Sequence, residues 1–335
     1  MPSTLEETLA EIRKRLNGEP QHDIETLFEA ADDYADEPYQ ADLNSEISRM
    51  LIDIASQGTP EEQKQISSFI SQQSSIKFAL ALAQARKNLK NQNYPEALET
   101  LAKLEKQITQ AISQAKEKEK GHVNVSFRYY FSPMEYALGD TYFPANSTIL
   151  LPLDLIGFLS LKAQALYLSG RMDEALYSLS QAFEYDPVSS DLAFLACDIA
   201  HKEHNVITFV SDLDKAHRYL YKKEDFNKYF FYLSTYMIEE KDHSQLGNKI
   251  RTLASEGAGT LEMQKALSIK DKAALTKLGY AYQPSAEVIA VALKETNLAQ
   301  TAKDTQAYNY FHSILVDLVG KDALDETMPG NVKLV

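Results

Sequence analysis

Few residues of the chain combine the types and spacing that chemistry requires. Asp198, His201 and His204 recur at intervals of three, which places them on one face of a predicted helix, where carboxylate and imidazole groups could ligate a metal ion. Spacing is the only sign of such a site, and solvated residues near a helix end explain it more simply. We therefore predict no metal site and no cofactor.

The sequence also gives little support for catalysis. Cys197 is the sole cysteine, which excludes an internal disulfide, and it stands where small residues pack, which favours a buried and inert thiol. There is no phosphate-binding loop, dinucleotide-binding fingerprint, zinc-protease motif or nucleophile elbow. Acid–base catalysis by carboxylates needs a desolvated cleft. The chain contains one candidate cluster of acidic residues, but it lies in a polar run, so we predict that the protein is not an enzyme. That cluster comprises Asp32, Asp33, Asp36 and Glu37.

Composition favours a globular, helical chain. The 335 residues are 44% hydrophobic and 24% charged, enough to bury a core and too apolar for wholesale disorder. The 12 glycines and 11 prolines fall below the usual shares of ~7% and ~5%. Turn formers are therefore too few for a many-stranded sandwich or barrel, and we expect an all-α fold.

Charge and targeting signals narrow the range of partners. The net charge is −14, and residues 1–50 alone carry 13 acidic and four basic residues. Nucleic-acid binding needs a basic surface, so we expect no nucleic-acid partner. The acidic residues form either a solvated helical face or an acidic docking surface. The polar start lacks the pattern of a signal peptide and no stretch is long and apolar enough to span a membrane, so we expect a cytoplasmic protein without a membrane partner.

The chain reads as amphipathic helices separated by short breaks. Leucine and isoleucine recur at helical spacing over 5–16 and again over 43–54, and Pro60 stands where a further helix begins. Other helices are expected from Pro284 and through Tyr310 to Leu318. Helices joined by such short turns typically form antiparallel hairpins.

The most informative pattern is a repeat of 34 residues. When the segment 159–182 is compared with the chain 34 residues further on, small residues coincide with small ones and Leu179 coincides with Leu213. A period of this length is the signature of a helical repeat array. The other coincident pairs are Ala163 with Cys197, Leu166 with Ala200, and Ala182 with Ala216.

The segment 159–187 resembles a tetratricopeptide repeat (TPR). Its two helices are separated by a turn at Gly170, and Pro187 prevents the second helix from continuing. A second match lies upstream, where Ala85 and Ala97 keep the 12-residue spacing of the first. The residues that carry the first match are Leu159, Ala163, Leu166, Gly170, Ala175, Leu179, Ala182 and Pro187.

This resemblance covers about residues 75–222 and implies a right-handed α-solenoid of TPR-like helical hairpins. We accordingly expect acidic N-terminal hairpins in 1–74, TPR-like repeats in 75–256 and capping helices in 257–335. The Pro-Met-Glu-Tyr segment at 133–136 and the block 186–191 are also similar to a poorly characterised group of bacterial TPR proteins, a resemblance that implies no assigned activity.

An aromatic insertion near 121–152, which we expect to be extended, separates the two matches. Ala97 and Ala175 are 78 residues apart, ten more than two repeats of 34. A long helix runs up to Gly121, after which apolar and polar residues alternate over 123–131, a pattern that predicts an extended strand. Aromatic residues concentrated between 127 and 143 either fill a gap in the solenoid or form a flap over its groove. The flap would offer a ligand Tyr129, Tyr130 and Tyr142.

In a TPR stack the first helix of each pair lines the concave face that receives the ligand. Carboxylate-binding TPR domains use clustered lysine, arginine and asparagine, and the asparagines are missing at the matched positions, so a helix or an extended peptide is the expected ligand. Counting from the matched repeats places on this groove Leu82, Arg86, Lys90, Ser160, Gln164, Tyr167, Phe194, Asp198 and His201.

The expected function is therefore that of a non-catalytic scaffold that binds a protein or peptide of unknown identity, with self-association left open. One alternative is a sensor of a small signalling peptide without its own DNA-binding domain, because residues 1–72 are too acidic to enter a DNA groove. The other is an enzyme whose site lies in the aromatic insertion.

Overall fold

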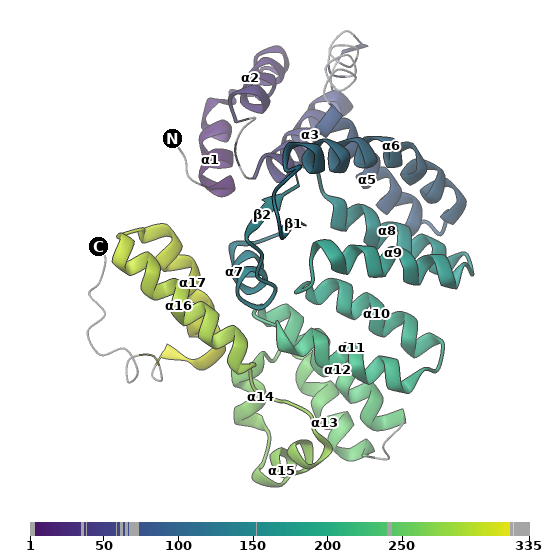
Figure 1. Cartoon of the computed structure of the whole chain (residues 1–335), viewed down its shortest axis with the longest axis vertical. Coiled ribbons are helices and arrows are strands. Elements are labelled where there is room, and N and C mark those ends of the chain that lie inside the picture. Colours follow the sequence, from purple (N-terminus) through teal and green to yellow (C-terminus); the bar gives the residue numbers. More distant parts are fainter. Residues whose placement is uncertain are drawn as a thin grey trace. The chain divides into compact units, whose positions relative to one another are not determined.

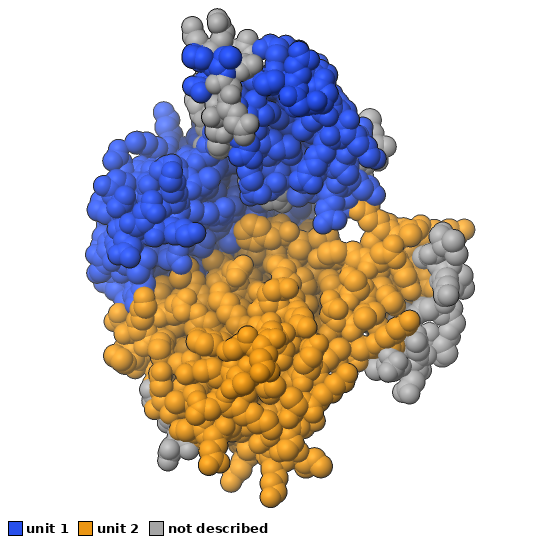
Figure 2. Space-filling view, turned by 180° about the vertical axis from the view of Figure 1, so that it is seen from behind, with its two compact units in different colours: residues 1–129, 145–185 blue, residues 130–144, 186–335 orange. Residues whose placement is uncertain are grey.

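The computed structural model is mostly helical, with sixteen helices and two short strands among the residues it describes (Figure 1). These are residues 4–34, 37, 39–57, 59, 60, 63, 66, 74–151, 153–239, 243–321 and 324. The chain divides into two compact units, coloured separately in Figure 2. Unit 1 comprises residues 1–129 and 145–185, and unit 2 comprises residues 130–144 and 186–335. The predicted boundaries at 74 and 256 stay predictions.

Unit 1 contains the N-terminal helices and two helical hairpins. Ile12, Leu27 and Leu43 are fully buried in a common core, which follows from the helical spacing of apolar residues in these segments. The helix predicted from Pro60 falls largely outside the described residues. The elements are α1 (Leu5–Arg15), α2 (Pro20–Asp33), α3 (Gln40–Gln57), α5 (Ser74–Lys90), α6 (Tyr94–Lys118), β1 (Val125–Arg128), β2 (Ser147–Leu150), α8 (Leu155–Leu168) and α9 (Met172–Tyr185).

Unit 2 is built on an aromatic core in which Phe226, Tyr229 and Phe230 are each 1% exposed. The two C-terminal helices predicted from the sequence are confirmed as α16 and α17. The elements of this unit are α7 (Pro133–Tyr142), α10 (Ser190–Lys202), α11 (Val206–Arg218), α12 (Lys223–Glu239), α13 (Ser244–Ser255), α14 (Thr260–Ala266), α15 (Ile269–Leu278), α16 (Ala286–Ala302) and α17 (Thr305–Val319).

Four hairpins close with the same turn, the fourth being α16–α17 with Lys303, and the turn also ends α13 and α15. At the joints α5–α6, α8–α9 and α10–α11, one residue takes a left-handed conformation: Gln92 (φ 62°), Gly170 (φ 77°) and His204 (φ 53°). In each, the next N–H donates to the carbonyl five residues earlier, with N···O distances of 2.8, 2.9 and 2.9 Å. This is the Schellman arrangement that ends many helices. Since Gly170 and His204 are 34 residues apart, the period seen in the sequence recurs in the backbone.

The insertion combines two strands with a helix. β1 and β2 pair in parallel, with Val125 opposite Ser147, so the prediction of an extended segment holds for a shorter range than 123–131. For the middle of the insertion it is wrong, because residues 133–142 form α7. The Ser132 hydroxyl accepts the Glu135 N–H at 3.1 Å, and Pro133 occupies the first helical turn. A serine N-cap followed by proline is a helix-starting combination, which outweighs the aromatic content of the segment.

Candidate peptide-binding surface

In unit 2, the predicted groove residues take part in a row of contacts between α10 and α12, called the α10–α12 row below. The Phe194 and Tyr232 rings stack with centroids 5.5 Å apart and an interplanar angle of 12°. Lys228 Nζ lies 4.6 Å from the centroid of the Phe194 ring. One turn along, the Tyr232 hydroxyl donates to a carboxylate oxygen of Asp198. Phe194 with Lys228, and Asp198 with Tyr232, are each 34 residues apart, the spacing noted in the sequence.

Charged pairs exposed to solvent flank this row at both ends. Lys228 Nζ is 3.8 Å from Asp191 Oδ1, and the two side chains are 42% and 74% exposed. At the other end His201 Nε2 lies 2.8 Å from Glu239 Oε2, with exposures of 46% and 49%. The row is thus buried at its centre and exposed to solvent at its ends.

The part of the groove that lies in unit 1 is more polar. Arg86 on α5 reaches Asp154, with 3.6 Å between Nη2 and Oδ2, and keeps 56% of its side chain exposed. Asp154 caps α8 by accepting the Gly157 N–H at 2.6 Å. Burial raises the pKa of the Asp154 carboxyl, and that N–H and Arg86 oppose the rise. Lys90 at the end of α5 is exposed.

The nine residues predicted for the groove differ in their access to solvent. Leu82 and Phe194 are 3% and 0% exposed, so their side chains belong to the core and not to an exposed lining. Both stand on helix faces turned toward a neighbouring helix, which the repeat count alone does not distinguish from faces turned to solvent. Whether the others contact a ligand stays a prediction. Exposed residues are Arg86, Lys90, Gln164 and His201, and half-buried ones are Ser160, Tyr167 and Asp198.

The aromatic residues predicted as a flap make contacts within their own units. Tyr129 is 6% exposed. The Tyr130 ring covers Gly139, where an added Cβ would lie 2.0 Å from the tyrosine oxygen. The Tyr142 hydroxyl donates to the Glu287 carbonyl at 3.4 Å. These contacts support the interpretation of the aromatics as packing residues, while binding of a ligand by a flap stays a prediction.

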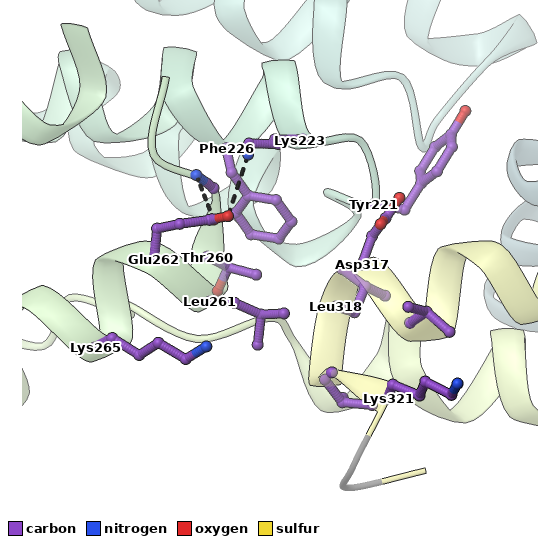
Figure 3. A pocket seen from close by; sticks show the side chains of 14 residues that line it. Tyr221, Lys223, Phe226, Thr260, Leu261, Glu262, Lys265, Asp317, Leu318 and Lys321 are labelled. Carbon is purple, nitrogen blue, oxygen red and sulfur yellow. Dashed lines mark hydrogen bonds and ion pairs between the residues drawn. The ribbon is translucent and has the colours of Figure 1, made fainter. Parts of the chain in front are cut away.

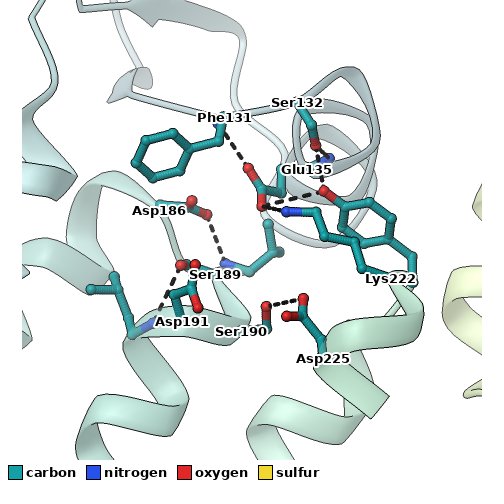
Figure 4. A network of polar contacts seen from close by, with 12 residues as sticks. Phe131, Ser132, Glu135, Asp186, Ser189, Ser190, Asp191, Lys222 and Asp225 are labelled. Carbon is teal, nitrogen blue, oxygen red and sulfur yellow. Dashed lines mark hydrogen bonds and ion pairs between the residues drawn. The ribbon is translucent and has the colours of Figure 1, made fainter. Parts of the chain in front are cut away.

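A buried carboxyl in α7 is the main feature that sequence reasoning missed (Figure 4). Glu135 is 4% exposed; it accepts the Phe131 N–H at 2.7 Å and lies 3.5 Å from the Tyr221 hydroxyl and 3.8 Å from Lys222 Nζ. Burial raises the pKa of Glu135, and Lys222 opposes the rise. The local signal was readable, since Ser132 three residues before a glutamate is a helix N-cap pattern.

The residues whose types could serve catalysis or metal binding are engaged in packing or pairing. Cys197 is fully buried, and burial raises the pKa of its thiol, so it has the properties of a packing residue. Asp198 and His201 bond to α12, and across the described part of the chain no three histidine, cysteine or acidic side chains gather as a metal site would require. None of the described helices has the length and apolarity to cross a membrane.

The chain was compared with protein-family models, with curated proteins and with solved structures, and none of them matches it. The interpretation of the surface therefore depends on its geometry and on the repeat in its sequence.

Proposed function

We propose that this protein is a non-catalytic scaffold that binds another polypeptide through the first helices of TPR-like hairpins. The observation that carries the proposal is the contact between residues 34 apart on α10 and α12. In a TPR array, equivalent residues of successive first helices lie side by side and together form the binding surface. The same turn recurs at Gly170 and His204, 34 residues apart, which supports the same period.

The chemistry of the surface favours an extended or helical peptide. In unit 1, Arg86 and Lys90 are exposed and able to pair with acidic groups or carbonyls, and Tyr167 offers a half-buried ring. Tyrosine and arginine are the residue types that most often dominate binding energy at interfaces. A peptide that covers about 800 Å² of such a surface would bind specifically.

The proposal is tested by selecting peptides from a displayed random library on the full chain. The affinity of a selected synthetic peptide is then measured by fluorescence anisotropy. We expect Arg86→Glu combined with Tyr167→Ala to weaken binding by about tenfold or more, since each change removes an anchor worth ~1 kcal/mol or more.

A matched control separates the groove from the remaining surface. Lys103 on α6 and Tyr177 on α9 belong to second helices of the same unit and are exposed by 71% and 64%. Lys103→Glu combined with Tyr177→Ala changes the same charge and ring size, and it should leave the affinity within about twofold. Equal loss in both double variants, or no loss in either, would show that the peptide does not bind the first helices of unit 1, α5 and α8.

A further inference from the structure

A pocket of about 530 Å³ lies in unit 2, lined by the first turn of α12, by α14 with the residue before it, and by the end of α17 (Figure 3). The apolar side chains that line it and keep accessible surface include the half-buried Leu261, Val316 and Val319. Small-molecule sites typically have volumes of ~300–1,000 Å³ and a largely apolar wall. The size and the lining therefore suit a small ligand with an apolar part.

The charged residues of the pocket are mainly cationic. Lys223, Lys265 and Lys321 line it, against the two acids Glu262 and Asp317. Lys223 Nζ is 3.2 Å from Glu262 Oε1, the ion pair drawn in Figure 3. Within the part of the chain that the structure describes, Lys265 and Lys321 have no acidic partner within 4 Å. In a chain with a net charge of −14, this excess of lysine favours an anionic ligand.

We propose that this pocket binds a small organic anion that joins a carboxylate to an apolar chain. The apolar part of the ligand would pack on the half-buried Leu261 and Val319, and the carboxylate would pair with Lys265, whose ammonium end is directed toward the pocket from α14 (Figure 3). A ligand without the apolar chain would bury no apolar surface of the pocket, and a neutral ligand would form no ion pair with the lysine. No residue predicted for the peptide groove lines this pocket, so the two proposals stand independently.

The probe is sodium octanoate, titrated into the full chain by isothermal calorimetry. We expect saturable binding at one site. Acetate carries the same charge without the chain, and octyltrimethylammonium carries the same chain with the opposite charge; neither should bind measurably. Absence of octanoate binding, or equal binding of the octyl cation, would overturn the proposal.

Two charge-reversal variants locate the site. Lys265→Glu should weaken octanoate binding by about tenfold or more, because it replaces the attracting charge with a repelling one. Lys277→Glu makes the same change at an exposed lysine of α15 outside the pocket and should leave the affinity within about twofold. Lys321→Glu takes the place of Lys265→Glu if circular dichroism shows that the latter is unfolded. Equal weakening by the pocket and control variants would indicate attraction to the whole chain and overturn the site.

Discussion

The hairpins from α10 to α13 and the insertion at 121–152 are stabilised in different ways. In the hairpins, Phe194 contacts Lys228 and Asp198 contacts Tyr232, in both cases a residue 34 positions further on. In the insertion the contacts belong to single residues, such as the Tyr130 ring over Gly139. In a repeat, several similar contacts each contribute to stability. The insertion depends instead on a few contacts that have no equivalents elsewhere. The two regions should therefore respond differently to substitution.

The largest effect is expected at the centre of the α10–α12 row. Phe194→Ala removes a fully buried ring that stacks on Tyr232, and it should lower the free energy of unfolding by about 3–5 kcal/mol. Phe231→Ala on α12 is the matched control, because that ring is 49% exposed, and it should cost about 1 kcal/mol or less. Urea unfolding measures both. Equal costs would mean that the row contributes no more than an exposed ring does.

The next effect concerns the insertion. Gly139→Ala places a methyl group where the end of the Tyr130 side chain lies, with only 2.0 Å to its oxygen. Because that end can swing away, the cost in free energy of unfolding should be modest, about 1–2 kcal/mol. The test is a double-mutant cycle in urea unfolding: once Tyr130→Ala has removed the ring, Gly139→Ala should cost little. Additive costs would show that the two residues do not interact.

A smaller effect is expected from the buried carboxyl of α7. Burial raises the pKa of Glu135 above its usual 4.5, so the folded state binds this proton more tightly than the unfolded state does. The stability contributed by Glu135 is complete below that value and is lost as pH rises through the raised pKa. Relative to wild type, Glu135→Gln should gain stability with rising pH, by at most about 1.4 kcal/mol per pH unit. Urea unfolding at pH 4 to 8 measures the change.

Asp271 gives a control of opposite sign. Hydrogen bonding to Lys249, at 2.6 Å, lowers the pKa of Asp271 to about 2. Its stabilisation is present above 3.8 and is lost as pH falls through about 2. Asp271→Asn should thus cost up to about 1 kcal/mol at neutral pH, as exposed ion pairs do, and this cost should disappear in acid. If both variants changed with pH in the same direction, the burial of Glu135 would not explain its effect.

The contrast between the regions also explains what the sequence could predict. Helical spacing located α1, and Gly121 marked the end of the long helix before the insertion, observed as α6 ending at Lys118. Glu135 could not be interpreted in the same way, because its partners Tyr221 and Lys222 lie more than 80 residues away and follow no repeat. The spacing of apolar residues along the chain predicts where helices form. Only a repeat also predicts which helices pack together.

The groove illustrates a second limit. Counting from the matched repeats placed Leu82 and Phe194 on the predicted binding surface, yet both are buried. On a first helix, the residues predicted to face the groove lie next to the residues that pack on the neighbouring helix. The two sets occupy adjacent positions around the helix. Periodicity gives the register along the chain, whereas burial depends on how closely neighbouring helices approach, which the sequence does not state.

The smallest effect on stability should come from the solvent end of the same row. His201 and Glu239 are 2.8 Å apart and both about half exposed, and such pairs contribute ~0–1 kcal/mol. His201→Ala should therefore leave urea unfolding within about 0.5 kcal/mol of wild type, while weakening a library-selected peptide severalfold, because its ring is accessible to a ligand. Phe194→Ala should lower the stability strongly. The variant molecules that remain folded should bind the peptide as the wild type does. A loss of stability from His201→Ala equal to that from Phe194→Ala would show that the row is uniform, with no separation between a packing centre and a binding end.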